Sequence, residues 1–153
     1  MEFPSWTEYE RLIYSLPETY PQIASSTLRL YSTSALTAIV EGSAYLRNGL
    51  EVQVVEALDF KIGRIQRYSY TVFRGGEKIR WYDPEPHAEI PELASTFPHH
   101  YHEPPDIKNN RKPAPGIRFR APNLPTLIAD CIALGDSLTT GPSACGWSGA
   151  PST

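Results

Sequence analysis

The side chains best suited to proton transfer or metal binding are gathered in one short stretch of this chain. All four histidines lie between His87 and His102, and Asp83 precedes them closely. The ordinary pKa of histidine is the one nearest neutral pH, and imidazole is also a common metal ligand. The other two histidines of this stretch, His99 and His100, are adjacent in sequence. This stretch is therefore the first candidate for a functional site.

Glu56 is a second residue that could take part in chemistry. It has the same alternation phase as Val52, Val54 and Leu58, where an apolar side chain is expected. A carboxylate on a core face must be paired, hydrogen-bonded or protonated. Two interpretations stay open: a structural ion pair with Arg67, and a general base or metal ligand at the polar end of a sheet.

The histidines allow three interpretations. In the first, they bind zinc, nickel or manganese together with Asp83, although adjacent His99 and His100 are poorly placed to hold one ion. In the second, they transfer protons in metal-independent RNA cleavage. That reaction needs a base for the 2′-hydroxyl, an acid for the leaving oxygen and cations on the phosphate. In the third, they form structural hydrogen bonds that fix a long loop to the sheet.

We take RNA cleavage as the leading hypothesis and expect neither a metal nor another cofactor. A non-catalytic protein-binding module and a metal-dependent hydrolase are the alternatives. The groups expected to transfer protons or to orient those that do are His99, His100, His102, His87, Glu56, Asp83 and Tyr70. The side chains expected to bind phosphate or RNA are Arg67, Lys78, Arg80, Lys108 and Arg111.

The charge pattern agrees with a phosphate-bearing partner. The net charge is −3, but residues 61–80 hold six basic and one acidic side chain, and residues 108–120 hold five basic and none acidic. Residues 81–107, between them, hold six acidic and no basic side chains. If both basic blocks fold beside the histidines, they form a cationic frame suited to RNA. The alternative is a solvated strand pair and a flexible basic loop.

The bulk properties predict one globular domain. Its 153 residues are 41% hydrophobic and 11% aromatic, which is typical of a folded protein. Two cysteines without metal-like spacing favour a reducing compartment, and we see no signal peptide or membrane span. We therefore expect a cytoplasmic domain over residues 1–134, without a membrane partner, followed by a disordered tail over residues 135–153.

The elements that must position the site predict an α+β fold. A helix is expected over residues 5–16, where Ser5 and Glu8 have capping-box spacing. A four- to five-stranded antiparallel meander is expected to follow. Ten of the fifteen prolines lie between Pro84 and Pro125, which predicts a long proline- and histidine-rich loop. A C-terminal helix is expected over residues 123–134. The expected strands are 26–32, 36–47, 50–58, 64–74 and 77–83.

The predicted hairpin of residues 64–74 and 77–83 has a register that can be tested. With a two-residue turn at Gly75-Gly76, Tyr70 lies opposite Trp81. In the same register, Tyr68 lies opposite Asp83. Side chains directly opposite one another share a face of the sheet. We therefore expect these four side chains to form a floor beneath the histidines.

The chain resembles the TumE-type toxins of prokaryotic toxin–antitoxin modules over about residues 26–134, in particular long members found in cyanobacteria. The residues that carry the resemblance follow one another in a fixed order. They are Glu56, Tyr68-Ser69-Tyr70, Tyr82-Asp83, His87 and Phe97-Pro98-His99-His100-Tyr101-His102. The resemblance implies a small toxin that is neutralised by a cognate antitoxin, and it assigns no catalytic residue.

One position departs from the family pattern. The family usually has a lysine between the last two histidines of this motif, where this chain has Tyr101. If that lysine contacts phosphate, Lys108 or Arg111 would take its place here. The segment after Leu134 matches nothing in the family pattern.

Overall fold

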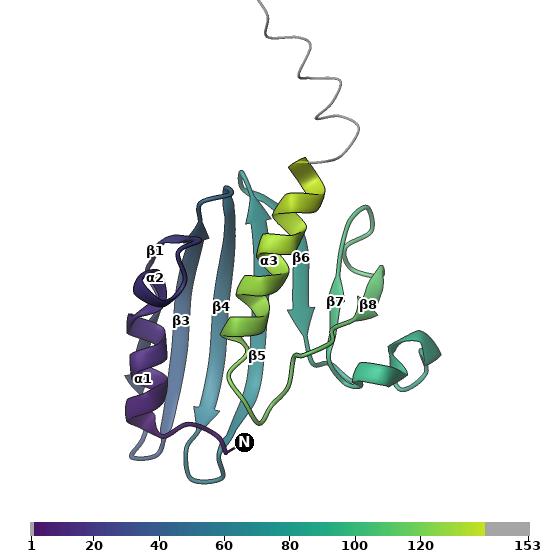
Figure 1. The fold of residues 1–153 in the computed structure, drawn as a ribbon. Coiled ribbons are helices and arrows are strands. Elements are labelled where there is room, and N and C mark those ends of the chain that lie inside the picture. The colour runs from purple at the N-terminus through teal and green to yellow at the C-terminus, as the bar shows by residue number, and fades with distance from the viewer. Residues whose placement is uncertain (1, 140–153) are drawn as a thin grey trace, which may run out of the picture.

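The computed structural model describes residues 2–139, and it has helices packed on one face of an eight-stranded antiparallel sheet (Figure 1). The predicted α+β class is confirmed, with more strands than expected. The sheet order is β1-β3-β4-β5-β6-β7-β8, and β2 also pairs with β3. The strands are β1 (Ile23–Ser26), β2 (Arg29–Ser32), β3 (Thr37–Leu46), β4 (Leu50–Asp59), β5 (Arg64–Arg74), β6 (Glu77–Asp83), β7 (His100–His102) and β8 (Arg111–Pro113).

The first helix begins at a capping box. Ser5 caps the first helix, and Glu8 returns the bond to the Ser5 backbone N–H, so the predicted capping box is confirmed. No helix of the described residues is long and apolar enough to cross a membrane. The helices are α1 (Trp6–Tyr14), α2 (Leu16–Thr19), the 3-10 helix η1 (Pro91–Thr96) and α3 (Leu124–Thr139).

Strand alternation gives the sheet two faces, which we name the helix face and the open face. The helix face carries Val54, Tyr70 and Tyr82, which are fully buried in the core with α1 and α3. The open face carries their sequence neighbours, such as Val55, which is 46% exposed, and Trp81. Successive side chains of a strand point to opposite faces. A residue's parity along its strand therefore decides whether it reaches the core.

Gly42 allows the first strand segment to break in two. The expected strand over residues 26–32 is instead β1 and β2, which both pair with β3 on either side of Thr27 and Leu28. Gly42 lies opposite that break with a φ of +134°, and a Cβ there would lie 2.5 Å from the backbone oxygen of Thr27. The close backbone approach therefore requires glycine.

Gly42→Ala is expected to lower the free energy of unfolding by about 3 kcal/mol, because it adds both backbone strain and a clash. Urea denaturation would measure it. Gly49→Ala is the control, since Gly49 also has a positive φ but a Cβ there would meet nothing within 4 Å. An equal loss in both variants would show that strain alone matters at Gly42.

The register of the β5–β6 hairpin differs from the prediction. Arg74 pairs with Glu77 as expected, but a bulge then shifts the ladder by one residue, so Tyr70 lies opposite Tyr82 rather than Trp81. The extra residue is Ile79 on β6. A one-residue shift moves every later side chain to the other face. The predicted floor is therefore wrong, because Trp81 and Asp83 point to the open face.

Two short strands and the end of the last helix also differ from the expectation. The proline-rich segment contains β7 and β8, which extend the sheet beyond β6. The C-terminal helix continues to Thr139, five residues past its predicted end, and Gly135 lies where a Cβ would meet the Asn48 side chain. Residues 135–139 are thus helical rather than a disordered tail. The predicted tail over residues 140–153 lies outside the described residues.

A histidine and aspartate cluster on the open face

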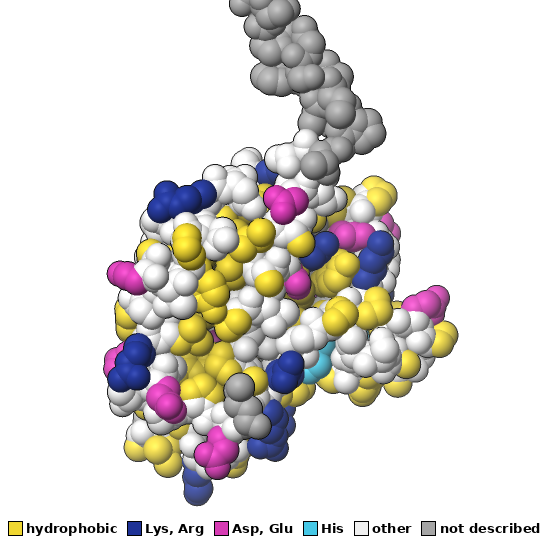
Figure 2. Space-filling view, viewed as in Figure 1, with side chains coloured by type: hydrophobic (Ala, Val, Ile, Leu, Met, Phe, Trp, Pro, Cys, Tyr) yellow, Lys and Arg dark blue, Asp and Glu magenta, His cyan; other side chains and the backbone are white. Residues whose placement is uncertain are grey.

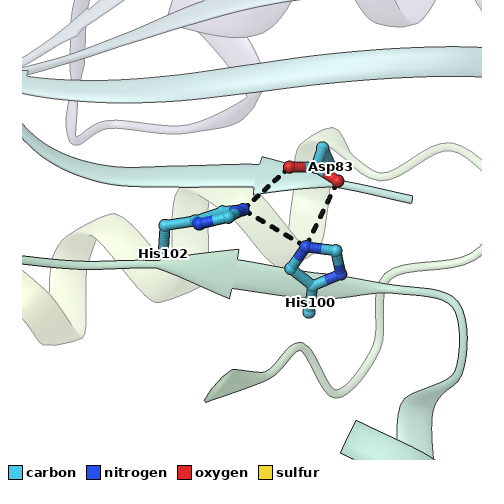
Figure 3. A group of neighbouring side chains, drawn as sticks. All are labelled: Asp83, His100 and His102. Atoms are coloured by element: carbon cyan, nitrogen blue, oxygen red, sulfur yellow. Dashed lines mark hydrogen bonds and ion pairs between the residues drawn. The ribbon is translucent and has the colours of Figure 1, made fainter. Parts of the chain in front are cut away.

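Asp83, His100 and His102 meet on the open face where β6 and β7 pair. Asp83 is the last residue of β6 and lies opposite His100, while His102 lies opposite Trp81. The alternation of β7 points both histidines to the same side as Asp83, as Figure 3 shows. His102 Nε2 lies 2.9 Å from one Asp83 carboxylate oxygen, and His100 Nε2 lies 3.2 Å from the other. The two Nε2 atoms are 3.2 Å apart.

Backbone carbonyls fix the orientation of both rings. Nδ1 of His100 lies 3.0 Å from the Pro98 carbonyl oxygen, and Nδ1 of His102 lies 3.1 Å from that of Lys108. A carbonyl oxygen only accepts, so both Nδ1 atoms carry hydrogen. In neutral rings, both Nε2 lone pairs then point towards each other and the carboxylate. A hydrogen bond between the Nε2 atoms requires a proton on one of them, so the cluster suits one neutral and one protonated imidazole.

Burial and hydrogen bonding set the charge state of the cluster. His100 is 1% and His102 3% exposed. Burial alone would raise the pKa of Asp83, but hydrogen bonds from His100 and from the Glu85 backbone N–H outweigh it and hold the pKa at about 2. Burial would lower the pKa of His100, but the Asp83 carboxylate and the Pro98 carbonyl raise it above its ordinary value. The cluster therefore favours an ionised Asp83 beside a protonated imidazole.

Two aromatic side chains enclose the cluster. Trp81 stacks on the His102 ring with centroids 4.4 Å apart, and its indole N–H donates to Ser69 Oγ. The His87 ring lies edge-on to that of His100, with centroids 5.3 Å apart, and its Nδ1 is 3.1 Å from a Glu89 carboxylate oxygen. The structure thus brings three of the four histidines together with Asp83.

His99 lies on the other face. Its Nδ1 is 2.6 Å from the Tyr68 hydroxyl oxygen, and its ring packs on Tyr68 and Phe119 beside the core. Burial lowers the pKa of His99 to about 4, and the positive charge of His100 adds to this. The ring is therefore neutral near pH 7 and shares a hydrogen bond with the Tyr68 hydroxyl. Its contacts are those of a residue that fixes the loop to the sheet.

Glu56 and Tyr70 are not part of the cluster either. Glu56 is fully buried on the helix face, as its phase predicted. Its two oxygens accept from the hydroxyls of Tyr9, at 2.6 Å, and Tyr70, at 2.5 Å, and Asn123 donates to the Tyr70 hydroxyl. The expected ion pair with Arg67 is wrong, since Arg67 is exposed on the open face. The expectation that Glu56 faces the histidines is corrected as well.

The basic residues proposed for phosphate binding lie in different places. Arg111 lies opposite His102 where β8 pairs with β7. Its positive charge acts to lower the pKa values of His100 and Glu89. Its buried Nε has no hydrogen-bond partner, and no described carboxylate lies within ion-pair distance of it. Lys78 lies over the Trp81 ring, with Nζ 5.4 Å from the centroid. Arg111 is therefore the cation best placed to serve the cluster.

The remaining two basic candidates are less well placed. Arg80 is on the helix face, where its guanidinium lies 4.1 Å from the Tyr101 ring centroid and 3.8 Å from Glu103. Lys108 has an exposed side chain, and its backbone carbonyl is what holds His102. Tyr101 thus points away from the cluster, so the departure from the family motif does not alter the cluster itself.

A shallow pocket adjoins His87. It has a volume of about 230 Å³ and is lined by His87, Ala88, Ile90, Ala94 and Phe97. Phe97 is 49% exposed there. On the helix side of the molecule, by contrast, basic and acidic side chains are scattered and form no single charged patch (Figure 2). The pocket beside His87 is therefore an apolar surface next to the cluster.

Comparison with known families identifies the class of this protein. A family model described as Toxin TumE matches residues 10–134. The chain belongs to the TumE toxin family, so the resemblance found in its sequence is confirmed. It is the toxin of a toxin–antitoxin module, and the family implies an antitoxin partner. Comparison with curated proteins and with solved structures found no match.

Proposed function

We propose that this toxin cleaves RNA in the cytoplasm by metal-independent acid–base catalysis at the Asp83, His100 and His102 cluster. The proposal is supported by the geometry of the two imidazoles: their Nε2 atoms lie 3.2 Å apart and their Nδ1 atoms are held by backbone carbonyls, so that one proton fits between them. One imidazole can accept a proton while the other donates one. Asp83 orients both rings and stabilises the charged one.

The proposed reaction uses both imidazoles in one step. The neutral ring takes the proton of the ribose 2′-hydroxyl, and the 2′-oxygen attacks the adjacent phosphorus. The bond from phosphorus to the 5′-oxygen breaks, and the imidazolium gives its proton to that oxygen. The products are a 2′,3′-cyclic phosphate and a 5′-hydroxyl. The charge that develops on the phosphoryl oxygens is stabilised by the Arg111 guanidinium.

The surroundings of the cluster support a single-stranded RNA substrate. Phe97 and the apolar pocket beside His87 offer a surface on which a base can stack. Lys78 and Arg67 lie on the same open face and can contact neighbouring phosphates. Arg80, on the helix face, has no part in this proposal.

The purified chain is expected to cut single-stranded RNA in the presence of EDTA and to leave DNA of the same sequence intact, because DNA lacks the 2′-hydroxyl. Arg111→Ala is expected to slow the cleavage about 100-fold, as the loss of a charge-stabilising donor does. The control is Arg29→Ala, because Arg29 is an exposed residue of β2 that forms an ion pair with Glu41 of β3. Intact RNA after incubation with the wild-type chain would refute the proposal.

A further inference from the structure

We propose that Asp83, His100 and His102 also bind a divalent transition-metal ion of the zinc class, and that this ion inhibits the toxin. The inhibitory half rests on the proposed function, since the ion and the catalytic proton would occupy the same place. The binding half rests on geometry alone. It differs from the expectation that the chain has no metal site.

The possible ligand atoms lie close together. The Nε2 atoms of His100 and His102 are 3.2 Å apart, and each lies near a different oxygen of the Asp83 carboxylate, at 3.2 Å and 2.9 Å. Metal–ligand bonds of about 2.0–2.2 Å separate neighbouring ligand atoms by roughly 3 Å in tetrahedral and octahedral sites. Each of the three residues offers one ligand atom, and all three atoms lie within 4.8 Å of one another. An ion can therefore bind with small side-chain shifts.

The hydrogen bonds that orient His100 and His102 are also those expected of metal-binding histidines. Histidines that bind metals commonly donate their other ring N–H to a backbone carbonyl or carboxylate, which fixes the ring and its tautomer. His100 and His102 do this through the carbonyls of Pro98 and Lys108. The inward-facing lone pairs of three acceptors repel one another unless a proton or a cation lies between them. The strands thus hold a site that requires positive charge at its centre.

The donor atoms select the class of ion. Two imidazole nitrogens and one carboxylate oxygen suit zinc and its neighbours, whereas magnesium and calcium prefer oxygen ligands. His87 is the nearest further imidazole, and the Glu89 carboxylate beside its Nδ1 leaves its Nε2 available. Adjacent His99 and His100 cannot share an ion. His100 and His102 can, because strand alternation places them on one side.

A bound ion removes both halves of the proposed acid–base pair. Coordination uses the Nε2 lone pair of each imidazole, so neither ring can take the 2′-hydroxyl proton. It also displaces the proton that the leaving oxygen needs. The metal-free chain is therefore the active form, and zinc competes with the proton for the Nε2 atoms of the two histidines.

The binding test uses the full chain without an affinity tag, made metal-free by dialysis against EDTA. Cobalt(II) is titrated with visible absorption as the readout, and zinc is titrated by calorimetry. One ion per chain is expected, with affinity lowered at least about 100-fold by Asp83→Asn, since even second-layer changes cost 10–100-fold. The control is Glu10→Gln, which changes an exposed carboxylate on α1. No binding, or equal binding in both variants, would overturn the site.

The activity test separates this inference from the proposed function. RNA cleavage by the metal-free chain should fall in proportion to zinc occupancy and return on addition of EDTA. If zinc binds and cleavage instead requires it, the inhibitory role and metal-independent cleavage are both wrong. If RNA is never cut, the proposed function fails, but the cobalt spectrum of wild type against Asp83→Asn still decides whether the site exists.

Discussion

Asp83→Asn is expected to lower RNA cleavage about 1,000-fold and to remove toxicity while leaving the toxin folded. Asparagine keeps the shape of aspartate and an oxygen to accept the Glu85 N–H. Its amide can donate to His102 Nε2, which satisfies the cluster without an added proton. The charged imidazole then loses its counter-ion, so proton transfer fails. Because general acid–base groups each contribute 10²–10⁴-fold, we expect cleavage to fall about 1,000-fold.

Growth of a host that expresses each variant from an inducible promoter measures toxicity, and thermal unfolding of the purified chains checks the fold. Glu10→Gln is the matched control and should remain toxic. His102→Ala is a poorer test, because it removes the partner of the Lys108 carbonyl and of one Asp83 oxygen and therefore also lowers stability. If Asp83→Asn arrests growth as the wild type does, the cluster is structural.

Glu56→Ala is expected to lower the free energy of unfolding by about 3–5 kcal/mol. It leaves the buried hydroxyls of Tyr9 and Tyr70 without an acceptor and opens a cavity between α1 and the sheet. Urea denaturation monitored by tryptophan fluorescence measures this. A loss below about 1 kcal/mol, the size of an ordinary exposed substitution, would contradict this account.

Glu56→Gln separates the charge of this residue from its hydrogen bonds. Burial raises the pKa of Glu56, and the two tyrosine hydrogen bonds offset only part of that rise. The stabilisation from a protonated Glu56 is therefore complete below the ordinary glutamate pKa and is lost as pH rises through the raised folded value. Glutamine does not titrate. The stability of the variant relative to wild type should thus increase from pH 4 to pH 8, and a constant difference would show that Glu56 does not titrate abnormally.

Local chemistry made much of the scaffold predictable. The Ser5 and Glu8 capping box and the strands over residues 64–74 and 77–83 follow from short-range patterns, and the structure has them. The alternation in β4 also placed Glu56 on the core face. Its partner Tyr9 lies on α1, far from Glu56 in sequence, and Asn123, which donates to its other partner Tyr70, directly precedes α3. No local pattern could therefore name these contacts.

The site itself depended on features that a pattern cannot fix. The bulge at Ile79 reverses which face Asp83 points to, and nothing in the sequence marks it. The prolines around His100–His102 predicted a loop, so β7 was not expected. The strand is only three residues long and fits between Pro98 and Pro104, so it does not need the N–H groups that proline lacks. Histidine clustering identified the right segment. Only the pairing of β6 with β7 shows which histidines lie beside Asp83.

Metal-independent cleavage at the Asp83, His100 and His102 cluster predicts the chemical identity of the RNA ends that form in EDTA. Mass spectrometry of a short single-stranded RNA incubated with the wild-type chain should show a 2′,3′-cyclic phosphate on one fragment and a 5′-hydroxyl on the other. The same incubation with Asp83→Asn should leave the RNA intact. Uncut RNA with the wild-type chain, or cleavage that is unchanged by Asp83→Asn, would contradict the account.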